Sequence, residues 1–208
     1  DRSPSRGLGD VYKRQGKNSV IKTPETTLKG NKLDYNLNSE LATAKEPYTV
    51  FYDEFTIKGN SGTFDNKNGI FKSNKADITS KSGDKFVADK ADGNLHEMRM
   101  DFIGNAKGHT NYDGKRTDFS GDFARVYFKK DADGYKAIRS EIKKNAVFIQ
   151  EDKTLKSDYI EADIERNLIF ARDNTKMIVK DKDNGDIIIT SDLSLIHISE
   201  PTRRTPIS

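Results

Sequence analysis

The sequence contains no cysteine and no tryptophan, and it has only three histidines among 208 residues. The absence of cysteine excludes disulfide bonds, thiol catalysis and cysteine-bound metal sites. Proline is scarce, with five residues, and no apolar run approaches the roughly 20 residues that a membrane-spanning helix needs. What remains is a polar chain, 33% charged and 33% hydrophobic. Its fold class therefore depends on how the few apolar residues are spaced.

The two ends of the chain are related to each other at the DNA level. Codons for residues 5–15 can be chosen so that their reverse complement encodes residues 193–203. Two evolved protein termini have no reason to share one DNA segment in opposite orientations, and both stretches resemble the translated mosaic-end adapter of transposon-based sequencing libraries. We therefore predict that residues 1–15 and 193–208 are adapter-derived artefacts, which are excluded from fold reasoning. The alternative is an apolar C-terminal strand around Leu195.

Between these ends, residues 16–192 are predicted to be one domain, a fragment cut at both ends. A signal peptide or an inner-membrane anchor would then have lain upstream of Gly16. Residues 1–15 carry a net charge of +2 and residues 193–208 a net charge of +1, which together account for the +3 of the whole chain. The insert is therefore neutral, and this removes the electrostatic case for nucleic acid as a partner.

A short unit recurs along the insert: a small residue with Asn or Asp, an alternating strand, a second polar turn and another strand. Its five instances begin at Gly30-Asn31, Gly59-Asn60, Gly83-Asp84, Gly121-Asp122 and Ser157-Asp158. Because Gly accepts positive φ and Asn and Asp tolerate it, each pair is predicted to reverse the chain. The spacing is too irregular for a propeller or a solenoid. The pattern therefore predicts an all-β, antiparallel roll of repeated hairpins.

Alternation at period two marks the faces of the strands, as in Leu33-Tyr35-Leu37, Met98-Met100-Phe102 and Ile160-Ala162-Ile164. Asn184-Gly185 predicts a further hairpin turn, and no segment has the pattern of an amphipathic helix. Additional strands are expected over residues 48–58, 75–80, 145–150, 177–180 and 186–190.

Units of the form G-[ND]-x-x-x-[YF], followed by a strand such as Asn145-Ala146-Val147-Phe148-Ile149, resemble the OstA-like lipopolysaccharide-export family. This family includes LptA- and LptC-type periplasmic proteins and the N-terminal domain of LptD. The resemblance covers most of residues 28–190 and departs from the pattern at Gly62 and Ser157. It implies an antiparallel β-jellyroll, or β-taco, whose two facing sheets are open along one edge. LptA-like and LptC-like remain alternatives, because the N-terminus distinguishes them.

The resemblance also implies a function. Members of the family pass lipopolysaccharide across the periplasm toward the outer membrane, and they bind one another head to tail through edge strands. We therefore expect a non-catalytic protein in the periplasm whose partners are lipopolysaccharide, through its lipid A, and other export proteins. A homo-oligomer and an inner-membrane anchor are left open.

A lipid that crosses an aqueous space must shield its acyl chains, because exposure costs about 0.8 kcal/mol per CH₂. Two sheets with apolar inner faces offer a slot for these chains, with no need of a cofactor or a reaction. The predicted lining consists of apolar strand residues. For any single one of them ordinary sheet core is the favoured alternative, because core and slot are the same face in this fold: Leu33, Tyr35, Leu37, Phe55, Ile57, Phe64, Ile78, Met98, Met100, Phe102, Ile138, Ile160, Ile164 and Phe170.

Motifs that would indicate catalysis or metal binding are weak. Gly104–Thr110 is one residue short of a phosphate loop and has His109 where a Lys is needed, so a turn between strands is predicted there. Asp181–Asp186 and Asp131–Gly134 do not match a calcium loop and predict hairpin loops instead. His96 and His109 have no companion at metal-ligand spacing and are expected at the surface. We therefore predict no cofactor, no metal site and no enzyme activity.

Two other functions are compatible with the pattern. A repetitive, β-rich surface or adhesin-type structural module predicts a core filled with large side chains and no open slot. A carbohydrate-active jellyroll enzyme predicts a cleft with convergent carboxylates of perturbed pKa. Strand lysines such as Lys129-Lys130 and Lys143-Lys144 would meet lipid phosphates in a carrier, but we favour a role in keeping edges and outer faces soluble.

Overall fold

A computed structural model describes residues 11–24, 26–112, 115–132, 134–180 and 185–197, and the regular structure in these ranges is antiparallel β-sheet. The all-β, antiparallel prediction is thus confirmed. The strands are β1 (Val11–Lys22), β2 (Thr26–Asn36), β3 (Leu41–Ala44), β4 (Tyr48–Tyr52), β5 (Phe55–Gly59), β6 (Ser61–Asp65), β7 (Ile70–Ser80), β8 (Lys85–Asn94), β9 (Arg99–Tyr112), β10 (Lys115–Asp131), β11 (Gly134–Gln150), β12 (Lys153–Asp163), β13 (Leu168–Val179) and β14 (Ile187–His197). In the described ranges no helix has the length and apolar character that crossing a membrane requires.

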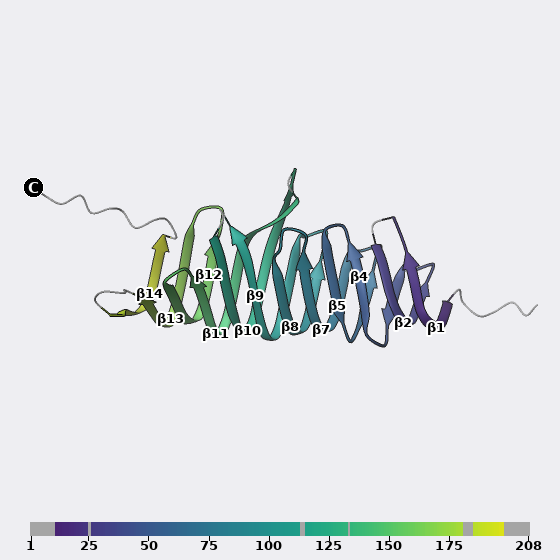
Figure 1. Cartoon of the computed structure of the whole chain (residues 1–208), viewed down its shortest axis with the longest axis horizontal. Helices are drawn as coiled ribbons and strands as arrows, with labels where there is room; N and C mark the ends of the chain where they lie inside the picture. Colours follow the sequence, from purple (N-terminus) through teal and green to yellow (C-terminus); the bar gives the residue numbers. More distant parts are fainter. Residues whose placement is uncertain (1–10, 25, 113–114, 133, 181–184, 198–208) are drawn as a thin grey trace, which may run out of the picture.

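The strands form one continuous ribbon along the long axis of the molecule (Figure 1). From β7 to β14 each strand pairs with the next one in the sequence. Nearer the N-terminus the ribbon divides, because β7 pairs with β6 through residues 70–74 and with β5 through residues 77–80. One strand therefore takes part in two sheet layers.

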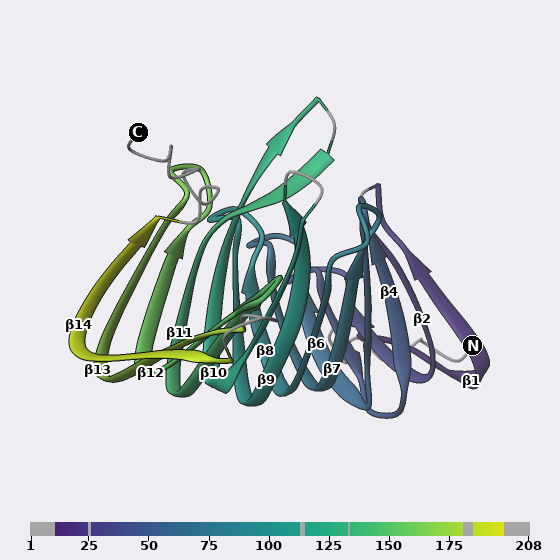
Figure 2. The same cartoon turned by 60° about the vertical axis from the view of Figure 1, so that its left-hand side comes forward.

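The ribbon folds along its length into two facing layers, which join along one side and are open along the other (Figure 2). We call the layer that contains β6 layer A and the layer that contains β5 layer B. The strands β1, β2 and β14 continue both layers. Elsewhere, layer A comprises residues 41–44, 61–65, 70–74, 90–94, 99–103, 123–127, 139–143, 159–163 and 168–172. Layer B comprises residues 48–52, 55–59, 76–80, 85–88, 106–112, 115–120, 146–150, 153–157 and 175–179.

The line along which the layers join, which we call the corner, uses backbone conformations that regular strands avoid. Two consecutive residues have positive φ in each of β9, β11 and β13, at positions 104–105, 144–145 and 173–174. The register between neighbouring strands shifts at the same places. Such bulges bend a strand and increase its twist, which is how one strand passes from layer A to layer B or back.

Asparagine side chains fasten these bends to the preceding strand. Each of three amides donates a hydrogen bond to an Asp carboxylate: Asn105 to Asp89 at 2.7 Å, Asn145 to Asp122 at 3.2 Å and Asn174 to Asp158 at 2.7 Å. The units at Gly121-Asp122 and Ser157-Asp158 therefore belong to a repeated corner and not to a repeated turn.

Four of the five predicted chain reversals are accordingly wrong. Gly30-Asn31, Gly121-Asp122 and Ser157-Asp158 lie within strands, and Gly59-Asn60 marks the passage from β5 in layer B to β6 in layer A. Only Gly83-Asp84 lies at a turn between paired strands, β7 and β8. At Gly121 a small residue is required for close approach, because a Cβ there would lie 2.6 Å from Ile142 Cγ2.

Other segments also differ from expectation. Residues 48–58 are not one strand but the hairpin of β4 and β5, which reverses at Asp53-Glu54. Gly104–Thr110 lies inside β9 and forms no turn. The expected hairpin at Asp131–Gly134 is confirmed, since β10 ends and β11 begins there. Residues 181–184, which include most of the second loop, lie outside the described ranges.

The strands β1 and β14 extend into the segments predicted to derive from an adapter. Residues 11–15 pair with β2, and residues 193–197 pair with β13. A strand can form from any sequence that alternates suitably, so this pairing does not test the DNA origin of the segments. That origin stays a prediction.

Candidate functional site

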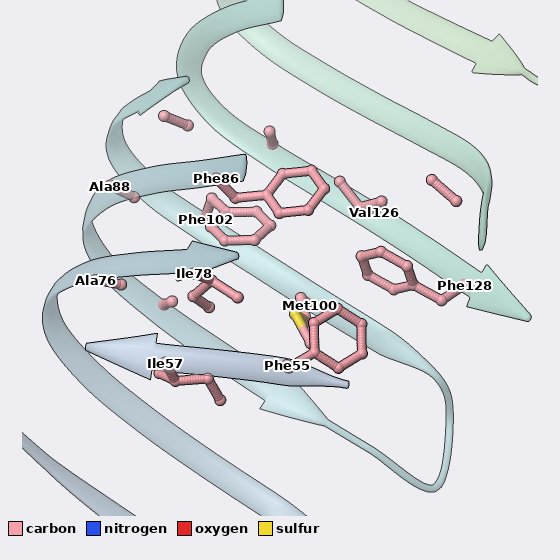
Figure 3. Packing of buried hydrophobic residues seen from close by; sticks show 14 of the residues in the cluster. Phe55, Ile57, Ala76, Ile78, Phe86, Ala88, Met100, Phe102, Val126 and Phe128 are labelled. Atoms are coloured by element: carbon pink, nitrogen blue, oxygen red, sulfur yellow. The ribbon is translucent and has the colours of Figure 1, made fainter. Parts of the chain in front are cut away.

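The space between the layers is apolar along the molecule. Alternate residues of each strand point into it, and side chains from the two layers meet there (Figure 3). The rings of Phe86 in layer B and Phe102 in layer A stack with centroids 5.2 Å apart, and Tyr48 in layer B meets Phe64 in layer A at 5.3 Å. Apolar burial between the layers is therefore the main force that keeps them together.

A chamber of about 310 Å³ opens between the layers near the N-terminal end. Its apolar wall includes Val50 and Ile57 from layer B, Phe64 and Phe71 from layer A, and Leu95 from the turn after β8. Its rim is polar: Thr23, Thr26, Glu40, Asp65, Asn66 and His96. An apolar wall beneath a polar rim suits a ligand that has one apolar part and one hydrated part.

The middle of the interior is filled by side chains. Ile78, Phe86 and Phe102 have no exposed surface, and Met100 is almost as fully covered. Phe86 also contacts the rings of Phe119 and Phe128, at 6.0 and 5.9 Å. The chamber is therefore closed on its C-terminal side.

Beyond the filled middle the interior holds two further small cavities, each of about 20 Å³. One lies beside Thr117 and Gln150, whose side chains form a hydrogen bond of 3.2 Å. The other lies between Leu155, Ile169 and Met177. These two cavities and the N-terminal chamber all lie in the space between the layers, which we call the groove. The packed side chains of the middle therefore interrupt the groove.

Most of the predicted lining residues point into the interior. The buried ones are Leu33, Phe55, Ile57, Phe64, Ile78, Met100, Phe102, Ile160 and Ile164, and Tyr35 and Met98 pack against this cluster while partly exposed. Only Ile57 and Phe64 among them line the chamber. Contact with a lipid stays a prediction for all of them.

Three of the predicted lining residues are placed differently. Leu37 lies in the turn after β2 and is 59% exposed, because the strand ends at Asn36. Ile138 is the extra residue of a bulge in β11 and is only half-buried. Phe170 lies on the outer face and contacts the ring of Tyr159, since the neighbouring Ile169 takes the inner position.

Val50, Phe71 and Leu95 line the chamber but were missing from the predicted set. Phe71 lies directly opposite Gly93, where a Cβ would overlap its ring. Phe71 and Ser73 occupy alternate positions of β7, and Phe71 pairs with a glycine of the next strand. An aromatic residue paired with glycine in this way is the sequence pattern that could have identified Phe71 as a lining residue. Leu95 carries no such signal, because its place depends on a turn: its N–H donates to Gly69 O at 2.7 Å.

The polar groups next to the groove are hydrogen-bonded. The Tyr48 hydroxyl donates to Ser73 Oγ at 2.6 Å, and burial raises the pKa of Tyr48 to about 12 although this hydrogen bond lowers it. At the rim, the hydrogen bond from Lys130 lowers the pKa of Asp53, and that from Asn68 lowers the pKa of Asp65. Among the described residues no group of three or more His, Cys, Asp or Glu side chains is arranged to hold a metal ion.

The histidines and strand lysines lie on the surface. His96 is exposed at the chamber rim, against Gly69, and His109 Nδ1 lies 3.4 Å from an Arg116 nitrogen. Lys143 lies over the rings of Phe123 and Tyr159 on the outer face of layer A. Its expected role in solubility stays a prediction. Lys129 and Lys130 differ, because they pair with Glu165 and Asp53 at the open side of the groove.

No model of a known protein family matches the sequence, and no curated protein matches it. Among solved structures, the chain is similar to the crystal structure of LptH from Pseudomonas aeruginosa, described as the LptA-homologous periplasmic component of the conserved lipopolysaccharide transport device. The two share 16% sequence identity with a TM-score of 0.49, over 65% of this chain and 93% of that one. At this identity the likeness assigns neither a function nor a ligand to the present chain.

Proposed function

We propose that the protein is a non-catalytic lipid carrier that holds acyl chains of lipopolysaccharide between its two β layers. The observation that carries the proposal is the chamber, which has an apolar wall, a polar rim and an opening on the unjoined side of the layers. An acyl chain in the chamber is removed from water at a gain of about 0.8 kcal/mol per CH₂. The sugars and phosphates of the lipid stay outside in solvent.

The wider setting belongs to the same proposal. The resemblance of the repeated units to the OstA-like family supports transport across the periplasm toward the outer membrane. Among the described strands, β1 pairs only with β2 and β14 only with β13. An edge strand can add to the sheet of another protein, and the resemblance implies that export proteins bind head to tail in this way. Head-to-tail assembly is therefore part of the proposed function.

One observation favours a second candidate, a β-rich structural module without cargo. The middle of the interior is packed with large side chains, as such a module requires. A carrier with this interior needs either to hold its lipid in the N-terminal chamber alone or to rearrange the middle. The two candidates differ in whether the folded protein binds lipid.

The test is lipid capture by the full chain, produced in the periplasm of a Gram-negative host. Lipid A that co-purifies is quantified by mass spectrometry and compared between the parent and Leu95→Trp, in which the indole fills the chamber. Ile103→Trp is the matched control, because Ile103 is exposed on the outer face of layer A. We expect lipid in the parent and the control, and a loss of at least about tenfold in Leu95→Trp, the change that about 1.4 kcal/mol of binding free energy produces.

Circular dichroism establishes that all three proteins are folded. A folded parent that never carries lipid A contradicts the proposal of a lipid carrier and favours the structural module. Equal lipid in all three proteins shows that lipid adheres elsewhere and refutes the chamber as the binding site.

A further inference from the structure

The hairpin that joins β10 and β11 extends beyond the rest of layer A. Lys129 pairs with Lys136 and Lys130 with Tyr135, whereas β9 starts opposite Tyr127 and β12 ends opposite Arg139. From Lys129 onward the hairpin therefore has no neighbouring strand within the described ranges. It projects from the open side of the molecule (Figures 1 and 2).

The hairpin reaches the opposite layer. The hydroxyl of Tyr135 donates to Asp53 Oδ2 at 3.2 Å, and the backbone N–H of Tyr135 donates to Glu54 Oε2 at 3.1 Å. Lys130 forms an ion pair with Asp53. Asp53 and Glu54 form the turn between β4 and β5, so these contacts connect the free edge of layer A to the free edge of layer B. They bridge the open side of the groove.

The base of the hairpin supplies rings that fill the groove beneath the bridge. Phe55 of layer B contacts the rings of Phe128 and Tyr135, at 5.6 and 4.9 Å, and Phe128 also meets Phe86 at 5.9 Å. Phe128 and Tyr135 are 5% and 6% exposed. These rings occupy the interval between the N-terminal chamber, which reaches Ile57 of β5, and the cavity beside Phe86.

We propose that residues 129–132 and 134–136 form a clasp, which closes the open side of the groove over its middle and swings away to let an acyl chain enter from this side, between the N-terminal chamber and the C-terminal cavities. The inference rests on the proposed function in taking an acyl chain as the ligand. The clasp is held from outside by few polar contacts, which solvent screens. An entering chain replaces the apolar contacts that the ring of Tyr135 loses, so opening does not leave an empty groove.

The clasp has a matched pair of test variants. Asp53→Asn with Glu54→Gln removes the charges that bind the hairpin while keeping the side-chain shapes. Glu151→Gln with Asp152→Asn is the control, because this acidic pair also occupies a turn at the free edge of layer B, between β11 and β12. None of the contacts found for Glu151 or Asp152 involves the hairpin: Glu151 pairs with Lys115, and Asp152 O accepts from the Lys180 N–H.

The first measurement is hydrogen exchange of the hairpin amides in the lipid-free protein. We expect exchange about tenfold faster in the Asp53→Asn, Glu54→Gln variant, the change that the loss of one charge-assisted hydrogen bond produces, and unchanged exchange in the control. The second is the rate at which the full chain takes up a fluorescent long-chain fatty acid, which should rise with the exchange rate. Equal exchange and equal uptake in variant and control overturn the clasp.

A locked state gives the opposite test. The chain contains no cysteine, so Asp53→Cys with Lys130→Cys provides a single pair of thiols that a short dithiol cross-linker can join. Cross-linking should slow fatty-acid uptake relative to the same protein without cross-linker, and undiminished uptake overturns the clasp. Labelled lipopolysaccharide is assayed in parallel. If no variant binds it while fatty-acid uptake follows the clasp, the clasp stands and the proposed transport of lipopolysaccharide fails.

Discussion

Replacing Gly93 by Ala tests whether the chamber wall is set by a contact between Phe71 and the backbone of β8. The two residues are direct partners across β7 and β8. A Cβ at Gly93 would lie 2.5 Å from Phe71 Cζ and closer still to two other ring atoms. The ring is 1% exposed and lies parallel to that of Phe64, with centroids 6.1 Å apart, so it moves only by disturbing this stack or by entering the chamber.

The expected cost follows from the burial of this contact. Overpacking a filled interior typically costs about 1–3 kcal/mol, and the chamber beside Phe71 gives the ring somewhere to move, which places Gly93→Ala within this range and not above it. For a chain of this length each kcal/mol lowers the melting temperature by about 2–4 °C. Urea unfolding followed by circular dichroism measures the loss, and Asp92→Ala, at the adjacent outward position, should change stability by less than about 0.5 kcal/mol.

A double-mutant cycle tests whether contact with the Phe71 ring causes the loss of stability in Gly93→Ala. Phe71→Leu removes the ring that the new methyl group strikes, so Gly93→Ala should cost at least about 1 kcal/mol less in a Phe71→Leu background than alone. Additive effects within about 0.5 kcal/mol would show that the two residues do not interact. The account of the chamber wall given above would then be wrong.

Three further predictions concern the corner, the outer face and pH. Asn105→Ala should destabilise the protein by about 1–2 kcal/mol, because Asn105 has a φ of 49° and donates to Asp89; Asn105→Gly should cost less, as urea unfolding will show. Arg125→Lys should cost about 1–2 kcal/mol, since Arg125 makes two hydrogen bonds of 2.6 Å to Asp101 that Lys cannot reproduce. Stability should fall between pH 10 and pH 12 by about 2–3 kcal/mol through Tyr48, whose pKa burial raises to about 12.

The sign of the pH effect follows from proton binding. Above pH 10 the tyrosine of the unfolded chain has lost its proton while Tyr48 in the folded protein keeps it, so unfolding is favoured as the pH rises until the folded pKa is passed. Tyr48→Phe should therefore reduce the alkaline loss in urea unfolding measured from pH 8 to pH 12, leaving the part that comes from Tyr135 and Tyr159, whose pKa values burial also raises to about 12. An equally steep loss in Tyr48→Phe would refute this assignment. For the corner, equal stability of the Ala and Gly variants at position 105 would refute the backbone argument.

The all-β class was predictable because alternation and turn chemistry are local. A pleated strand sends successive side chains to opposite faces wherever it lies, so Met100 with Phe102 and Ile160 with Ala162 could be placed on inner faces from spacing alone. Where apolar residues are consecutive, their spacing does not show which of them points into the interior. In Leu168-Ile169-Phe170 the inner position belongs to Ile169 because of its pairing with Ala162, and only the register of β12 against β13 decides this.

The repeated small-residue-plus-Asp unit shows the same division between local and tertiary information. The sequence by itself determined that small residues recur at these positions, whereas the positive φ angles of the corner lie on the neighbouring strands, at 104–105, 144–145 and 173–174. Whether such a position reverses the chain or bends a continuing strand depends on whether the residues after it pair with the same neighbouring strand. At Gly121-Asp122 they do, since β10 pairs with β11 on both sides of the bulge.

The groove and its clasp were decided by tertiary structure alone. Neither the contact of Tyr135 with Asp53 nor the closure of the chamber could be predicted from the sequence, because the two residues lie 82 positions apart and no local pattern links them. Apolar alternation specifies which side chains leave water. How the two layers approach each other, and which rings then fill the space between them, follows from the packing of the whole ribbon.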